Sequence, residues 1–165
     1  MTTPVQGYPS VMRVLALATL VGGSAIFATA SASAGECPAG KITPDGQKPV
    51  TTANKDVTDT VIASIDLNEE APHLKDHKFR LRKLVVKPGG VVAWHSHGER
   101  PAIIYIVSGT IVEYASTCSV PIIHKSGDVA RETHTTAHWW KNKSKKPVVL
   151  LSTDILHDKM DQHTM

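Results

Sequence analysis

The sequence of 165 residues predicts an all-β domain, because its apolar residues fall in short β-branched runs separated by turn residues. The runs are bounded by Gly, Pro, Asn or Ser at a spacing that is typical of a sandwich or barrel. No internal repeat interrupts them. The predicted strands are Val61–Leu67, Phe79–Lys87, Val91–His97, Ala102–Val107, Thr110–Ala115, Pro121–His124 and Val148–Asp154.

The residues between these strands are typical of tight turns. Lys87–Gly90 reads Lys-Pro-Gly-Gly. In a tight turn, proline presets the φ angle of the second position and glycine adopts the positive φ of the third. Ser108–Gly109 and Ser126–Asp128 separate other strands in the same way. Several short antiparallel strands must cover their edges, and a jelly-roll barrel of two sheets does so. We therefore expect one such barrel over residues 57–156.

The first 34 residues predict a cleavable secretory signal. Arg13 is their one charged residue, the apolar run Val14–Ala30 follows it, and Ala32–Ala34 forms an A-x-A cleavage site. The alternative is an uncleaved membrane anchor, but the run is shorter and less apolar than the roughly 20 residues of a spanning helix. The mature chain would begin at Gly35, would be periplasmic or secreted, and would leave the membrane after cleavage.

An extended arm is expected over residues 35–56, where prolines and glycines forbid a regular element. The arm holds Cys37, and the other cysteine, Cys118, lies in the predicted barrel. An oxidising compartment favours a structural disulfide between them, which would remove roughly 4 kcal/mol of unfolded-chain entropy. A redox-active pair or a cysteine metal ligand are the alternatives, and neither has C-x-x-C spacing to support it.

The charge of the chain excludes one class of partner. The formal net charge is +3, and the one basic cluster, Lys141–Lys146, is typical of a solvated turn. Nucleic-acid affinity needs many clustered cations that displace phosphate counterions. We therefore expect no nucleic-acid partner.

His95 and His97 point to the same face of their predicted strand, because side chains alternate with period two. Two imidazoles on one face can approach one metal ion at about 2.1 Å each. An exposed pair of surface histidines is the alternative reading.

The sequence around this pair resembles the two motifs of the cupin superfamily. In the first motif a glycine ends a turn and two histidines are metal ligands, and in the second motif a histidine is the third ligand. The matching positions are Gly89, His95, His97 and Gly109, then, 18 residues on, Gly127, followed by His138 and Asn142. The resemblance implies a small single-domain cupin: a double-stranded β-helix with a divalent iron, manganese, copper or zinc ion on His95, His97 and His138. Homodimers are common among such proteins.

The match departs from the family pattern at one ligand position. Cupins usually have a glutamate four or five residues after the second histidine, where this chain has Pro101 and Ala102. The carboxylate has either been lost, leaving a three-histidine site, or moved to Glu99 or Glu113. His134 is a further candidate, either as a fourth ligand or as a donor that orients one; a solvent-facing turn residue is its alternative.

Two residues near the histidines are candidate catalytic groups. Arg100 can hold a carboxylate ligand in a two-point grip, and its alternative is an exposed loop arginine. Tyr105 can present a hydroxyl to the pocket, and its alternative is a packed core tyrosine. The tail, residues 157–165, concentrates His, Asp and Met, which suits metal capture or a frayed polar terminus.

Three functions remain open at this point. The first is a metal-dependent oxidoreductase of the dioxygenase type, which resembles the three-histidine cupin dioxygenases. The second is a non-catalytic module that binds a metal or small ligand for sensing, storage or delivery, since this fold hosts both classes. The third is a structural barrel without a metal.

Overall fold

The computed structural model describes residues 35–70 and 74–159, so the predicted signal and the end of the predicted tail lie outside the described residues. The regular elements are eight β-strands, which confirms the all-β prediction. They are β1 (Lys55–Asp66), β2 (His77–Ser96), β3 (Ala102–Ser108), β4 (Thr110–Ala115), β5 (Ile122–Lys125), β6 (Val129–Glu132), β7 (Ala137–Lys141) and β8 (Val148–His157). Within the described ranges, no helix is long and apolar enough to cross a membrane.

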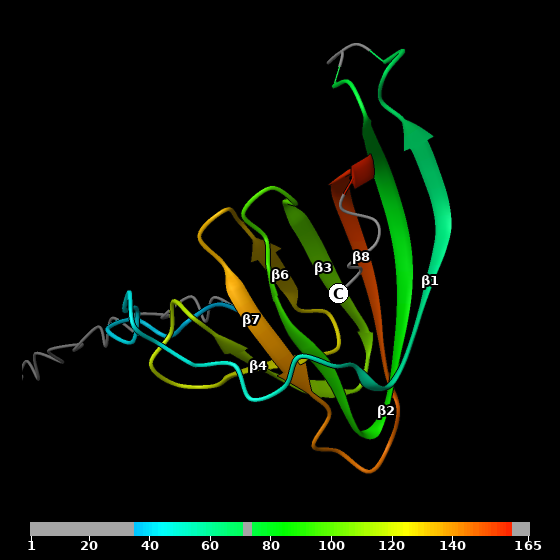
Figure 1. The fold of residues 1–165 in the computed structure, drawn as a ribbon. Coiled ribbons are helices and arrows are strands. Elements are labelled where there is room, and N and C mark those ends of the chain that lie inside the picture. The colour runs from blue at the N-terminus through cyan, green and yellow to red at the C-terminus, as the bar shows by residue number, and fades with distance from the viewer. Residues whose placement is uncertain (1–34, 71–73, 160–165) are drawn as a thin grey trace, which may run out of the picture. The chain divides into compact units, whose positions relative to one another are not determined.

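The strands form one sheet that curls into a nearly closed barrel (Figure 1). The strand order is β5-β4-β7-β2-β8-β3-β6, and β1 pairs with β2. The 20-residue strand β2 joins the two halves, because its first part pairs with β8 and its last part with β7. Ile106 in β3 contacts the turn between β5 and β6. Its N donates to Asp128 O at 3.0 Å, and its O accepts from Gly127 N at 2.9 Å.

The predicted turn at Lys87–Gly90 is instead a bend inside β2. Gly89 has φ of +75°, which only glycine adopts without strain. The register with β1 shifts between Lys55 and Val57, opposite this bend. Residues 87–90 of β2 therefore lie opposite a single residue of β1. This irregularity bends β2 from one half of the barrel to the other.

Two strands of the barrel, β6 and β7, were not predicted. Both are short, and their inward positions include polar side chains, such as Glu132 in β6 and His138 in β7. A buried polar residue hides the alternation of apolar and polar residues by which a strand is recognised.

Inward-facing side chains from both halves form the main core. β8 shows the pattern most clearly, because every second side chain from Val148 to Leu156 is buried. The core cluster consists of Leu84, Val86, Val92, Ile104, Ile106, Ile111, Ala130, Trp140, Val148 and Leu150. This cluster is apolar, and the buried polar side chains gather around His138 and around Asp154.

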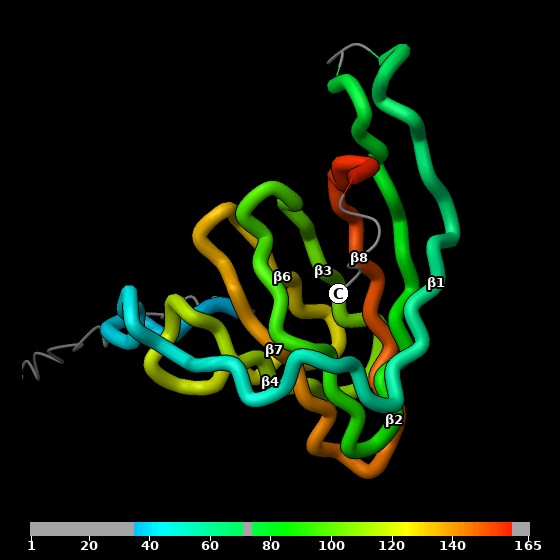
Figure 2. The backbone as a smooth tube through the Cα atoms, in the orientation of Figure 1, coloured from blue at the N-terminus to red at the C-terminus, as the bar shows by residue number. Residues whose placement is uncertain are grey.

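The N-terminal arm runs alongside β4 and β7 before it enters β1 (Figure 2). Thr43 N donates to Thr117 O at 3.0 Å, and the indole of Trp139 donates to Lys48 O at 3.2 Å. A disulfide joins Cys37 to Cys118, which confirms the predicted pairing. The arm is therefore fastened to the barrel covalently at one end and by hydrogen bonds along its length.

Candidate metal centre

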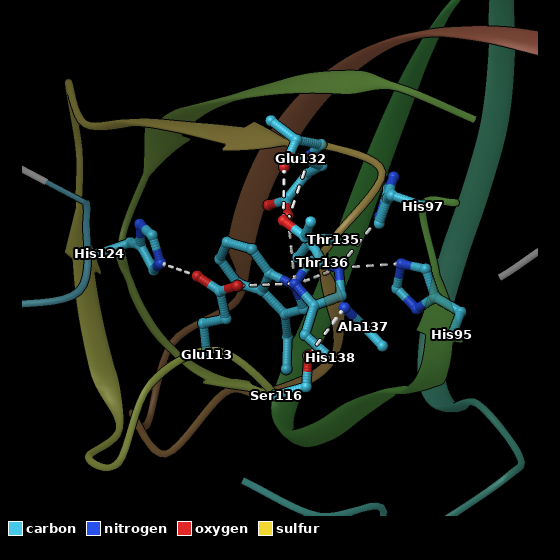
Figure 3. Close-up of polar contacts among 12 residues, drawn as sticks. His95, His97, Glu113, Ser116, His124, Glu132, Thr135, Thr136, Ala137 and His138 are labelled. Carbon is cyan, nitrogen blue, oxygen red and sulfur yellow. Dashed lines mark hydrogen bonds and ion pairs between the residues drawn. The ribbon is translucent and has the colours of Figure 1, made fainter. Parts of the chain in front are cut away.

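Three histidine side chains converge inside the barrel. His95 lies in β2, His138 lies directly opposite it in β7, and His97 follows the end of β2. The Nε2 atom of His138 is 3.1 Å from the Nε2 atom of His95 and 3.1 Å from that of His97 (Figure 3). The two distant motifs therefore meet at one point, as the sequence predicted.

Each ring is oriented by an oxygen atom that bonds its other nitrogen. His95 Nδ1 is 2.8 Å from Ala93 O, and His97 Nδ1 is 2.8 Å from Arg100 O. His138 Nδ1 is 2.7 Å from the carboxylate of Glu113. Because a carbonyl or carboxylate oxygen only accepts, each Nδ1 carries the proton and each Nε2 turns a lone pair toward the common point.

This arrangement fits a divalent transition-metal ion. Three nitrogen ligands at about 2.1 Å from one ion, at 90–109° to one another, lie about 3.0–3.4 Å apart. The Nε2 separations of 3.1 Å fall in this range. Imidazole suits zinc, copper, iron and manganese, so the donor set does not select among them.

Two buried carboxylates and a fourth histidine surround His138. Glu113 on β4 bonds His138 through one oxygen and His124 Nε2 on β5 through the other, at 2.8 Å. Glu132 on β6 places one oxygen 3.4 Å from His138 Nδ1, and its other oxygen has no hydrogen-bond partner among the described residues. These carboxylates approach Nδ1 of His138, the nitrogen that points away from the other two histidines. Glu113, Glu132 and His138 also form a second group of potential metal-ligand atoms.

The buried groups of the site shift one another's pKa values and keep two of the three imidazoles neutral. Burial, and then the neighbouring His138, lower the pKa of His95 and bring that of His97 to about 3. Although burial opposes both shifts, Glu132 and Glu113 raise the pKa of His138, and hydrogen bonds from histidines lower the pKa of Glu113 to about 2. Burial, together with the charge of Glu113, raises the pKa of Glu132 to about 8.

A small cavity lies between the histidines and the apolar core. Its volume is about 10 Å³, room for about one water molecule. Arg82 and Ser152 are the polar residues of its wall besides the histidines. The full lining is Arg82, Leu84, Val92, His95, His97, Ile104, Trp140, Leu150 and Ser152.

Arg100 is buried beside the site, but its guanidinium does not face the histidines' common point as a free group. Its Nη1 donates to Asp154 at 2.9 Å, and Asp154 also pairs with Arg80 and Arg82. The carboxylate that Arg100 bonds, through one nitrogen, is thus a side chain of the protein and not a bound ligand. Arg100 contributes to the site through its carbonyl oxygen, which fixes His97.

Tyr105 does not line the site, which corrects its predicted catalytic role. Its neighbours Ile104 and Ile106 point into the core, so Tyr105 points to the outer face, where 45% of it is exposed. The strand alternation of β3 dictates this placement.

Glu99 and His134 are also placed away from the predicted ligand set. Both are exposed, and neither belongs to the groups of potential ligand atoms in the described part of the chain. β2 ends at Ser96, so its alternation does not continue to Glu99. His134 lies in the turn that Thr136 N closes on Thr133 O.

Comparison with known proteins agrees with this fold. A family model described as "Cupin domain" matches residues 82–154. Similar solved structures include an uncharacterized protein with a double-stranded beta-helix domain from Klebsiella pneumoniae (17% identity, TM-score 0.50, covering 64% of this chain and 82% of that one). Another is a predicted oxalate decarboxylase from Thermotoga maritima (21% identity, TM-score 0.51, covering 70% and 97%). Residues 82–154 thus form a cupin domain, whereas no curated protein matches the chain significantly.

Proposed function

We propose that this cupin is an exported, metal-dependent oxidoreductase of the dioxygenase type, which acts on a small molecule. The observation that carries the proposal is the convergence of three imidazole lone pairs at the wall of a mainly apolar cavity. The Nε2 atoms of His95, His97 and His138 would hold the ion. A bound iron, manganese or copper ion would supply redox chemistry there, and zinc would supply Lewis-acid chemistry alone.

The surrounding residues would keep the site rigid and dry. Ala93 O, Arg100 O and Glu113 fix the three rings, so the ligands need no rearrangement to bind an ion. The mainly apolar cavity has room for about one water-sized group, so it would admit the metal-binding end of a small ligand rather than the whole ligand. Arg82 and Ser152 would give that ligand hydrogen-bond partners.

The test is metal content followed by dioxygen uptake. The full chain is purified from the compartment to which it is exported, analysed for metals, and reconstituted with Fe²⁺. We expect about one ion per chain and oxygen uptake that depends on an added small thiol, phenol or dicarbonyl. His95→Ala should lose both, and His134→Ala, an exposed histidine outside the triad, should keep both. A wild-type chain that binds no metal would overturn the proposal.

A binding module is the second candidate, and the small volume of the cavity favours it. A site with room for about one water molecule suits storage or sensing of an ion better than turnover of a bulky substrate. This function predicts that metal raises the melting temperature while none of the three substrate classes consumes oxygen. Zinc as the native metal would support it further.

Export and dimerisation belong to the same proposal. The Cys37–Cys118 disulfide supports an oxidising compartment. Ile103 and Tyr105 expose apolar surface on the outer face of β3, and a second copy of the chain would cover the same face. Light scattering should give twice the chain mass, and Tyr105→Lys should halve it. Ile123→Lys, at an exposed position on β5, is the control that should remain dimeric.

A further inference from the structure

A cleft lies between the start of the arm and the strands that carry the buried carboxylates. Its volume is about 450 Å³, and it is lined by Gly35, Glu36 and Cys37 on the arm and by Glu113 and Glu132 on β4 and β6. The first described residue of the chain therefore shares a cleft with the groups that orient His138. Gly35 is also the residue that follows the predicted signal.

His124 presents an unused hydrogen-bond acceptor at this place. Its Nε2 lies 2.8 Å from Glu113 Oε2, and a carboxylate oxygen accepts, so the ring proton of this hydrogen bond is on Nε2. Nδ1 is then a lone pair. It is fully buried, and within the described ranges it has no hydrogen-bond partner. A buried polar atom without a partner costs about 1–3 kcal/mol.

Gly35 lies directly against that acceptor. A Cβ atom on Gly35 would stand 2.8 Å from His124 Nδ1 and 2.7 Å from Val129 O, and the residue has φ of +85°. Only glycine fits such a position. The disulfide at Cys37, two residues further on, holds this end of the arm in place. Two acceptors thus face the Cα atom of residue 35, which carries the nitrogen that signal removal would free.

We propose that signal removal places the new amino terminus in this cleft, where it completes a hydrogen-bonded chain to the metal centre. Water hydrolyses the Ala34–Gly35 peptide bond and leaves a carboxylate on Ala34 and an ammonium group on Gly35. The ammonium donates to His124 Nδ1 and to Val129 O. His124 then donates to Glu113, and Glu113 holds the proton of His138, so the terminus orients a metal ligand through two residues.

An ammonium group suits this cleft better than the amide it replaces. It has three N–H donors where an amide has one, and its positive charge lies near the ionised Glu113. Stacking on Trp140, with ring centroids 4.5 Å apart, holds the ring of His124 in position. The inference rests on the proposed export and, for its effect on metal, on the proposed three-histidine site.

The first experiment locates the terminus. The full precursor is exported, and the intact mass of the product should correspond to residues 35–165. A variant with one serine inserted between Ala34 and Gly35 should give a product one residue longer, whose ammonium no longer reaches His124. A serine inserted between Ala39 and Gly40 is the matched control, because Gly40 has no atoms near its Cβ position. A wild-type product that begins elsewhere overturns the proposal.

The second experiment measures the contact without metal. The extended terminus should shift the ¹⁵N resonance of His124 Nδ1 and lower the melting temperature by about 3–10 °C. In a His124→Phe background the extension should change nothing, because the acceptor is gone. An unchanged His124 resonance in the extended protein would disprove the contact.

Metal affinity then tests the hydrogen bonds that lead from His124 through Glu113 to His138. The extended protein should bind Zn²⁺ several-fold more weakly than wild type, since the orientation of His138 is relaxed. If neither protein binds zinc while the His124 resonance still shifts, the three-histidine function fails and the terminal contact stands. If the His124 resonance shifts but both proteins bind zinc with equal affinity, the terminus contacts His124 without affecting His138. That result would overturn the proposed link to the metal centre.

Discussion

Among the residues of the site, Glu113 is the orienting group that a substitution can remove. The rings of His95 and His97 are fixed by backbone carbonyls, of Ala93 and Arg100, whereas that of His138 is fixed by a side chain. The carboxylate of Glu113 also places a negative charge beside the point where the metal ion would bind. The contribution of an orienting group to metal binding is therefore measurable here one residue at a time.

Glu113→Gln should weaken metal binding by about 10–100-fold while the barrel stays folded. Glutamine keeps an oxygen for His138 Nδ1 but loses the charge and cannot accept from both His124 and His138 equally well. Chelator competition with Zn²⁺ measures the affinity. Glu99→Gln, at an exposed carboxylate outside the site, should match wild type. Equal affinities for the two variants would remove Glu113 from the centre.

Asp154 is linked to the site by its ion pair with Arg100, whose carbonyl oxygen fixes His97. Although burial opposes the shift, its bonds to Arg80, Arg82 and Arg100 lower its pKa. The folded pKa then lies below the unfolded value of about 3.9, so the stabilisation is complete well above that pH and is lost as pH falls through the folded value.

Asp154→Asn should therefore lower the free energy of unfolding at pH 7 by about 3–5 kcal/mol, because three buried cations lose a charged partner. The variant should also lose less stability than wild type between about pH 5 and pH 2. Urea unfolding across this range provides both numbers. Asp158→Asn breaks an exposed pair with Lys78 and should cost less than about 1 kcal/mol. A similar cost for the two variants would contradict the role of Asp154.

Sequence periodicity was sufficient to bring two histidines of the site together and insufficient for the residues that contact the third. His95 and His97 share a strand face, and the cupin motif supplied His138. Glu132 and His124 were not predicted, because they reach His138 and Glu113 only after β6 and β5 take their places in the sheet. Glu113 was named as a displaced ligand, and its actual contact is with the far nitrogen of His138.

At the scale of the elements, the bend of β2 decides whether the two motifs meet. The strand carries His95 at its far end, and its last part pairs with β7 only after the bend at Gly89 and Gly90. A proline and two glycines predicted a turn there, and the same local geometry was used inside a continuous strand. Which outcome occurs depends on β1 and β7, the partner strands, which local sequence does not specify.

Gly90→Ala should disturb this bend and lower stability by about 1–3 kcal/mol. A Cβ atom at position 90 would stand 2.8 Å from Lys87 O and 2.9 Å from Asp56 O, and backbone atoms cannot move aside cheaply. Thermal unfolding and metal content are the measurements, and both should fall. Gly98→Ala meets its nearest atom at 3.6 Å and is expected to unfold like wild type. Retained metal in an unaltered Gly90→Ala protein would show that the bend tolerates a side chain.

For the whole molecule, the arm and the barrel behave as one folded unit because they are cross-linked. The cysteine pair was predictable from the export signal and an even cysteine count. The path of the arm was not, since it depends on hydrogen bonds to Thr117 and Trp139, which are far away in sequence. Long-range pairing of this kind also determines the strand order of the barrel, which no local pattern encodes.

The disulfide should supply a large share of the stability of the whole chain. It joins residues 81 positions apart, and closing a loop of that length in the unfolded chain removes about 4 kcal/mol of entropy. The double variant Cys37→Ser, Cys118→Ser should therefore lose about that much free energy of unfolding in urea and keep its β-sheet circular dichroism. Wild type treated with a reductant should unfold at the same urea concentration as the variant. If the double variant were as stable as the oxidised protein, the hydrogen bonds of the arm alone would hold it, and the cross-link would have no thermodynamic role.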